Sequence, residues 1–226
     1  MKTVILNVSI GSQYVAWQEK LQESLHKHND NVNCMFWTDI LPDGCPEHRD
    51  VPYAFKPYVF MEARKCGFDM ALWLDSPIIC QKPIQPIWDY LENGPGYEFH
   101  FSWWKVGQWC SDAALQKHGI SRDEAMDIHD NWACIMGLNF KSPDANGFLY
   151  QWMESAMDGV SFVGEWNNDD QCLSKDPRCM GHRHDQCISA ILCHKMGLTR
   201  IPWEPAKFFA YQFQDQNDSV CLVHTR

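Results

Sequence analysis

The sequence predicts an α/β fold with a mostly parallel central sheet flanked by helices, formed as one domain over residues 1–226. Three observations support this prediction. Short apolar segments alternate with segments of helical periodicity through the first 75 residues, as in doubly wound sheets. Segment 70–74, MALWL, is apolar throughout, which is typical of a strand buried on both faces. The chain is 45% hydrophobic and long enough to bury a large core.

The first 75 residues supply three predicted strands and two predicted helices. The strands are 3–9, 32–37 and 70–74, and the helices are 14–26 and 56–65, with Pro57 suited to a first helical turn. A loop rich in Pro, Gly and Asp covers 38–52. Crossovers between parallel strands are right-handed by default, so the strand ends should meet at one edge of the sheet.

The rest of the chain is less regular. We expect helices over 84–91, from Ser121, over 144–157 and over 185–196, and strands over 98–102, 133–140 and 219–223. Glu124 stands at capping-box spacing from Ser121, Asp144 is the expected cap of its helix, and Gly197 should end the last helix. Residues 158–180 form a predicted polar loop.

The composition excludes several classes of protein. Lys and Arg number 19 against 29 Asp and Glu, a net charge of −10, and no basic cluster offers a surface for nucleic acid. No apolar segment reaches the length of a membrane span or of a signal-peptide core. The 11 scattered cysteines favour a cytoplasmic protein with reduced thiols. Most of the 11 tryptophans must lie in the core, but indole faces also pack against sugar rings.

Small or polar residues follow each of the first three predicted strands. Gly11 follows the first strand, Thr38 and Asp39 end the second, and Asp75 and Ser76 follow the third. Ligands of open α/β sheets bind beyond the carboxyl ends of the strands. Together these residues favour a nucleotide site over the alternative of three ordinary turns.

Two charged residues flank the third strand. Asp75 ends an apolar strand, where a carboxylate is costly without a partner, and a divalent cation on a diphosphate is one such partner. The alternative is that Asp75 caps the following turn. Lys56 lies near the start of the preceding helix, where anions are favoured, and the alternative is an exposed lysine.

Three segments resemble GT-A glycosyltransferases. Segment 73–78, WLDSPI, followed by KPI at 82–84, resembles their Asp-x-Asp motif, with Pro77 in place of the second Asp. Segment 181–186, GHRHDQ, resembles the one that places an Asp at a helix N-terminus facing the reacting sugar. Segment 221–224, CLVH, resembles a terminal strand that leads to a metal-binding histidine. The resemblance extends from Asn7 to His224 and is closest in style to the compact glycosyltransferases of large chlorella viruses.

The resemblance implies a nucleotide-sugar donor, with uridine diphosphate (UDP) as the expected nucleotide and a glycan hydroxyl as the acceptor. It also implies viral capsid glycosylation in a host cytoplasm, where one such viral domain transfers rhamnose. The implied donor-binding residues are Gly11, Tyr14, Thr38, Asp39, Lys56, Asp75, Ser76 and His182. A divalent cation, manganese or magnesium, is the expected cofactor. Asp75 and His224 would bind this cation, although Pro77 offers no side-chain oxygen to it.

Asp185, with His184 beside it, is expected to carry the chemistry. At a retaining site Asp185 would flank the anomeric carbon or hold sugar hydroxyls, and at an inverting site it would deprotonate the acceptor. The resemblance favours retention. The alternatives are an N-cap aspartate and surface histidines.

The acceptor is expected beside an aromatic loop that contains Trp103, Trp104 and Trp109. Trp104 and Asp130 are the implied acceptor contacts, and closure of this loop over the site would exclude water.

Two other interpretations stay open. Cysteines and histidines at 172, 179, 182, 184 and 187 suggest a zinc module, although their spacing departs from the regular pairs of zinc sites. A sugar- or nucleotide-binding module without catalysis also fits the altered metal motif. No G-x-G-x-x-G follows the first strand, which argues against a dehydrogenase.

Overall fold

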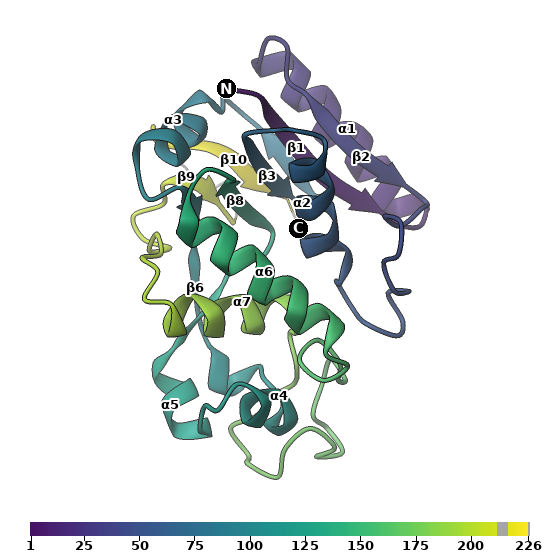
Figure 1. Cartoon of the computed structure of the whole chain (residues 1–226), viewed down its shortest axis with the longest axis vertical. Coiled ribbons are helices and arrows are strands. Elements are labelled where there is room, and N and C mark those ends of the chain that lie inside the picture. Colours follow the sequence, from purple (N-terminus) through teal and green to yellow (C-terminus); the bar gives the residue numbers. More distant parts are fainter. Residues whose placement is uncertain (212–216, 226) are drawn as a thin grey trace.

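The centre of the computed structural model, which describes residues 1–211 and 217–225, is a five-stranded sheet of order β2–β1–β3–β8–β5 (Figure 1). β1 pairs in parallel with β2 and β3, whereas β8 runs antiparallel to β3 and to β5. The mostly parallel α/β sheet predicted from the sequence is therefore confirmed. Its strands are β1 (Thr3–Ser9), β2 (Cys34–Thr38), β3 (Met70–Leu74), β5 (Tyr97–Glu98) and β8 (Ile135–Asn139).

Helices cover both faces of this sheet because alternate residues of each strand point to opposite sides. Leu6 of β1 lies in one core with Phe60 and Phe148, whereas Ile5 lies in a second core with Leu21 and Ile87. The first core is covered by α2 (Phe55–Lys65) and α6 (Pro143–Met157). The second is covered by α1 (Ser12–His28) and α3 (Gln85–Asn93).

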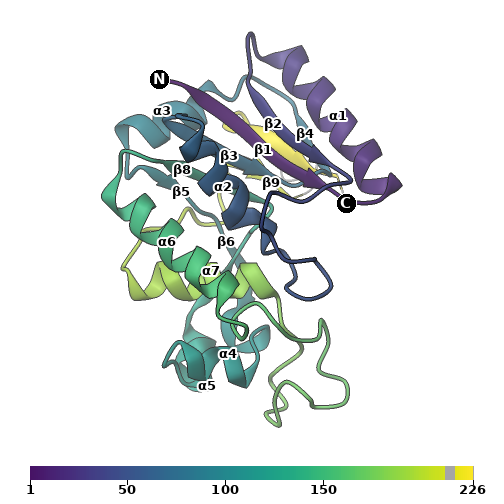
Figure 2. The ribbon, with the colours of Figure 1, turned by 45° about the vertical axis from the view of Figure 1, so that its right-hand side comes forward.

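The other described elements after β3 include two small sheets, one 3₁₀ helix and three α-helices. One sheet has the order β4–β10–β9, and the other pairs β6 with β7. α4 and α5 lie at the end of the molecule away from α1 (Figure 1). α7 lies beside α6 (Figure 2) and packs against β7. The added elements are β4 (Ile78–Cys80), β6 (Phe101–Lys105), η1 (Val106–Gln108), α4 (Asp112–Lys117), α5 (Arg122–Asp127), β7 (His129–Asn131), α7 (His184–Lys195), β9 (Phe208–Ala210) and β10 (Val220–His224).

The structure corrects several local predictions. Ser142 caps α6, because its side chain accepts a hydrogen bond from the Ala145 amide, so Asp144 lies inside the helix instead of capping it. The predicted strand 98–102 is divided between β5 and β6, so Trp103 and Trp104 lie in a strand and not in a loop. Within residues 1–211 and 217–225, no helix combines the length and apolarity needed to cross a bilayer.

Candidate active site

A chain of hydrogen bonds joins the carboxyl ends of β1, β2 and β3. Asn7 Nδ2 donates to the Leu74 carbonyl at 2.6 Å, and Gln18 Nε2 donates to Asn7 Oδ1 at 2.8 Å. The Thr38 hydroxyl donates to Gln18 Oε1 at 2.6 Å, and the Ser76 hydroxyl donates to Asn7 Oδ1 at 3.2 Å. The strand ends therefore meet at one edge, held together by two buried amides that the sequence analysis missed. The only sequence signal for Asn7 is a polar residue inside an apolar strand.

The end of β1 and the end of β2 present exposed groups at the same edge. The Gly11 amide donates to Asp39 Oδ1 at 2.8 Å. Gly11 has a φ of 89° and Asp39 a φ of 55°, left-handed conformations that turn the chain sharply at both ends. Tyr14, in the first turn of α1, is 41% exposed and its ring packs edge-on against Trp17 at 5.3 Å. These residues come together as predicted for a nucleotide site, and their role in binding stays a prediction.

Lys56 lies at the centre of the candidate site. Its ammonium is 2.8 Å from Asp185 Oδ2, 3.4 Å from Asp75 Oδ1 and 2.8 Å from the Ala133 carbonyl, to which it donates. Asp75 Oδ1 also accepts a hydrogen bond from Trp73 Nε1 at 2.7 Å. Because the Lys56 side chain is only 3% exposed, the alternative of an exposed lysine is wrong. The structure thus brings together the two carboxylates and the lysine that the sequence analysis singled out from three separate segments.

Asp185 owes its position to the start of α7. It stands in the first turn of that helix, where the helix dipole favours a negative charge. The residue at the N-cap position is Arg183, and no side chain forms a capping hydrogen bond there. The N-cap alternative for Asp185 is therefore wrong, and its carboxylate faces Lys56 instead.

Burial sets the charge state of this cluster. Burial raises the pKa of Asp185 to about 6, although the Lys56 ammonium opposes that change. Burial disfavours the charged form of Lys56, but Asp185 and Asp75 outweigh it, and the pKa of Lys56 is raised above its usual value. Asp185 can therefore exchange a proton close to neutral pH beside a lysine that stays charged.

Asp130 is a buried carboxylate of β7. Gln186 Nε2 donates to Asp130 Oδ2 at 2.6 Å, and the Asn131 amide donates to Oδ1 at 3.0 Å. Burial raises the pKa of Asp130 to about 7. With no exposed surface and both oxygens engaged, Asp130 holds Gln186 in place, which conflicts with the predicted contact to an acceptor.

His182 and His184, on either side of Arg183, are both buried. The alternative that they are surface histidines is therefore wrong. The Ser111 amide donates to His182 Nδ1 at 3.2 Å, and His182 Nε2 donates to the Ser161 carbonyl at 3.0 Å. Both ring nitrogens are engaged and the residue has no exposed surface, which conflicts with its predicted contact to the donor. His184 Nδ1 lies 3.0 Å from the Phe162 carbonyl, and burial lowers the pKa of His184 to about 3, so this ring is neutral at physiological pH.

Arg183 is a cation that the sequence analysis did not select. Its guanidinium lies between the rings of Trp109 and Trp166, with its central carbon 3.7 Å and 3.6 Å from the two ring centroids. Trp104, the predicted acceptor contact, packs edge-on against Trp109 at 5.5 Å. Burial lowers the pKa of Arg183 to about 10, and the residue stays charged at neutral pH. The only sequence signal for Arg183 was its position two residues before Asp185.

Aromatic rings line a cavity of about 250 Å³ between β6, β9 and residue 132. Trp103 lies 4.7 Å from Trp132, which stacks on Tyr211 at 4.5 Å, and Trp103 is 44% exposed. Trp132 directly precedes Ala133, whose carbonyl accepts the Lys56 hydrogen bond. Trp132 thus links the cavity to the charged cluster along the chain, although Lys56, Asp75 and Asp185 do not line the cavity themselves. Trp103, not Trp104, lines it.

The predicted cation ligands are Asp75 and His224, and their binding of a metal stays a prediction. His224, at the end of β10, stacks on Tyr211 at 4.9 Å. Its neighbour Thr225 donates its amide to the Pro77 carbonyl at 3.1 Å, which brings the end of β10 beside the altered motif. Lys56 and Trp73 already engage Asp75 Oδ1. In the described part of the chain, no group of three metal-ligating side chains includes Asp75 or His224.

The zinc module predicted at 172, 179, 182, 184 and 187 does not assemble. Cys172 is exposed, and His184 Nδ1 faces the Phe162 carbonyl. His182 and Cys187 do meet a third group, the buried thiol of Cys110, which the sequence analysis did not consider.

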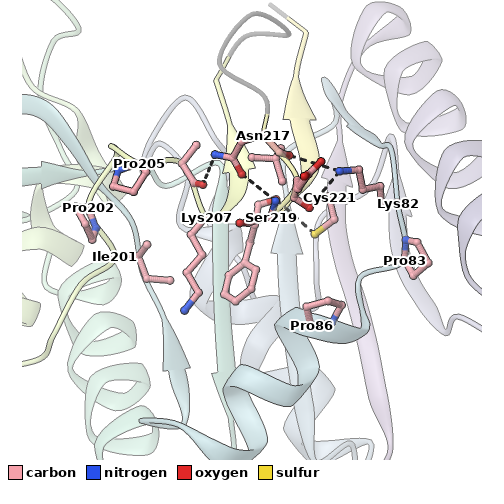
Figure 3. A pocket seen from close by; sticks show the side chains of 14 residues that line it. Lys82, Pro83, Pro86, Ile201, Pro202, Pro205, Lys207, Asn217, Ser219 and Cys221 are labelled. Atoms are coloured by element: carbon pink, nitrogen blue, oxygen red, sulfur yellow. Dashed lines mark hydrogen bonds between the residues drawn. The ribbon is translucent and has the colours of Figure 1, made fainter.

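A cavity of about 980 Å³ lies between the start of α3 and the β9–β10 pair (Figure 3). Four prolines line it, with Lys82 and Lys207 on opposite sides (Figure 3). Lys82 donates to the Asp218 carbonyl at 3.2 Å. Lys56, Asp75 and Asp185 do not line this cavity. The cavity is therefore separate from the charged cluster.

No family model and no curated protein matches the sequence. Solved structures do match. A glycosyltransferase involved in the glycosylation of the major capsid of PBCV-1 aligns with a TM-score of 0.52 at 12% identity, covering 99% of this chain and 93% of that one. Mouse xyloside xylosyltransferase 1 aligns with a TM-score of 0.54 at 10% identity, covering 100% of this chain and 98% of that one. The chain therefore has the GT-A glycosyltransferase fold, and its predicted resemblance to a chlorella virus glycosyltransferase is confirmed at the level of the fold.

Proposed function

We propose that the chain is a glycosyltransferase that moves a sugar from a nucleoside diphosphate to a glycan hydroxyl. The observation that carries this proposal is the ion cluster of Lys56, Asp75 and Asp185 at the carboxyl end of β3, in a fold shared with glycosyltransferases. Burying a lysine with two carboxylates is costly for stability alone, and such clusters concentrate at functional sites.

The donor is proposed to lie along the edge where β1, β2 and β3 end. Its base would pack on Tyr14 and reach the turn of Gly11 and Asp39, which present exposed groups there. Its diphosphate would lie toward Asp75 and the N-terminus of α2, whose dipole favours anions. UDP is the first nucleotide to test.

The reaction breaks the bond between the anomeric carbon and the diphosphate oxygen, and forms a bond from that carbon to the acceptor oxygen. The acceptor hydroxyl loses its proton, which Asp185 or the leaving diphosphate can take. Asp185 suits this task because its raised pKa of about 6 makes it a usable base near neutral pH. Proton removal by Asp185 belongs to an inverting reaction. Following the family resemblance, we propose retention of the anomeric configuration, in which the leaving diphosphate takes the acceptor proton and Asp185 flanks the anomeric carbon or holds sugar hydroxyls.

We propose that the positive charge of Lys56 does part of the work that a divalent cation does elsewhere. Lys56 holds Asp75, and Pro77 supplies no second carboxylate. A manganese or magnesium ion, if it binds, would bind Asp75 and the donor's own oxygens, with His224 as a candidate further ligand.

The acceptor is proposed to occupy the aromatic cavity. Trp103 and Trp203, 44% and 39% exposed, offer indole surface to the apolar face of a sugar ring. The cavity of about 250 Å³ matches a single saccharide unit in order of magnitude.

Calorimetric titration with UDP, in manganese and in EDTA, tests the donor site. We expect UDP to bind in both conditions, and more weakly in EDTA. Equal UDP binding in both conditions would still support a transferase. It would mean that protein groups alone neutralise the charge of the diphosphate. Failure of UDP and the other nucleoside diphosphates to bind would reject the proposal.

A second candidate is a sugar- or nucleotide-binding protein without catalysis, which the replacement of the usual second Asp by Pro77 favours. Turnover separates the two. Release of UDP from a UDP-sugar by the wild-type chain, lost in Asp185→Asn, supports the enzyme. Tight donor binding with no hydrolysis or transfer over a panel of UDP-sugars supports the binder.

A further inference from the structure

Three buried sulfur and nitrogen groups meet at the base of α7. The ligand atoms of Cys110, His182 and Cys187 all lie within 4.8 Å of one another, and all three residues have no exposed surface. They come from separate segments: Cys110 lies between η1 and α4, whereas the other two flank the first turn of α7. Cys187 Sγ is 3.7 Å from His182 Nδ1.

The hydrogen bonds of His182 fix which nitrogen faces the thiols. Because the Ser111 amide donates to Nδ1, the ring proton lies on Nε2, which donates to the Ser161 carbonyl at 3.0 Å. The lone pair of Nδ1 accepts from the Ser111 amide, with Cys187 Sγ 3.7 Å away. A backbone carbonyl that accepts from the second nitrogen is the usual support of a metal-binding histidine.

We propose that Cys110, His182 and Cys187 bind a zinc ion. Two thiolates and one imidazole are ligands that zinc prefers.

Zinc binding here is an exchange of protons for metal. Burial raises the pKa of the Cys187 thiol well above its usual value, so the metal-free cluster holds neutral thiols. Zinc displaces one proton from each cysteine that it binds, and Nδ1 exchanges its hydrogen bond with Ser111 for a bond to the metal. The ion would join the loop before α4 to the start of α7 and so position Asp185, two residues before Cys187.

Metal analysis of the purified full chain tests the site without any sugar donor, so its outcome is independent of the proposed function. We expect stoichiometric zinc that survives dialysis in wild type and in Cys193→Ser, and is lost in Cys110→Ser and Cys187→Ser. Cys193 is the matched control because it is a buried cysteine of the same helix outside the cluster. Zinc retained by Cys110→Ser, or lost from Cys193→Ser, would overturn the proposal.

A second measurement needs no variant and therefore does not depend on variants that fold. Cobalt exchanged into the wild-type chain should give thiolate-to-cobalt charge-transfer absorption and the d–d bands of a tetrahedral site. Wild-type protein that holds no zinc and shows no such absorption with added cobalt would contradict the assignment.

Discussion

At the scale of single residues, Lys56 is the buried cation on which the cluster depends. Lys56→Met leaves Asp185 and Asp75 facing each other without a counter-charge, and we expect a loss of about 3–5 kcal/mol in the free energy of unfolding at pH 8. The loss should shrink at pH 5. The folded pKa of Asp185 is raised, so its proton is bound more tightly in the folded chain as pH falls through about 6.

Urea unfolding of the Lys56→Met variant at pH 5 and pH 8 measures this effect. Lys65→Met is the matched control, because Lys65 lies at the other end of α2 with its side chain 68% exposed and should change stability little. An equal loss at both values of pH would show that packing, and not the unpaired carboxylates, accounts for the cost.

The protonation of Asp185 should also control the rate. If Asp185 acts as a base, kcat/KM rises with pH through an acid limb near pH 6 and then levels off. Asp185→Asn should abolish transfer while leaving UDP affinity unchanged. A pH profile of transfer between 5 and 8.5, with UDP titrations of both forms, tests this. An Asp185→Asn variant that transfers sugar normally would remove the residue from the chemistry.

Asp75 should matter for the leaving group. Asp75→Asn removes the charge that faces the proposed diphosphate and its cation, and we expect a fall in turnover of roughly 10²-fold or more. Asp30→Asn is the control, since Asp30 is exposed at the opposite edge of the sheet, before β2. Initial rates of UDP release decide the matter, and near-native turnover by Asp75→Asn would reject its role.

At the scale of elements, the start of α7 is fixed by a close backbone approach at Gly181. A Cβ there would lie 2.0 Å from the Trp166 carbonyl oxygen, so Gly181→Ala should cost about 1–3 kcal/mol and displace the first turn of α7, with loss of transfer. Gly147→Ala in α6 meets only the terminal methyl of Met196 at 3.3 Å and should stabilise the chain by up to about 1 kcal/mol. Thermal unfolding and transfer rates distinguish the two, and a fully active Gly181→Ala would contradict this account.

Local sequence patterns predicted the helices and strands. The features that the sequence analysis missed depend on contacts between residues far apart in the chain. β1 and β3 have the boundaries that their apolar runs indicate, and Ser121 caps α5 as its spacing implied. The Ala133 carbonyl that holds Lys56 lies 77 residues along the chain from it, and no spacing rule reports such a pair. The sequence also could not distinguish Trp103 from Trp104. Adjacent residues of β6 point to opposite sides of the strand, and only the structure shows which of them lines the cavity.

At the scale of the whole molecule, the donor edge and the aromatic cavity meet at the segment that contains Trp132 and Ala133. The donor groups come from the first three strands, and the cavity is built by β6, β9 and the chain around residue 203. Changes in the cavity should therefore affect acceptor use without changing donor binding.

Trp103→Ala is the sharpest test of that separation, because its ring contacts Trp132 and Trp203 and is 44% exposed. Loss of one stacking surface is worth about 0.5–1.5 kcal/mol, so the acceptor KM should rise by roughly 2- to 13-fold with UDP affinity unchanged. Tyr150→Ala is the control, since Tyr150 is an exposed aromatic residue on α6 that contacts Arg64. Acceptor kinetics and UDP calorimetry on both variants check this. A weaker UDP complex with an unchanged acceptor KM would place the donor, and not the acceptor, in the aromatic cavity.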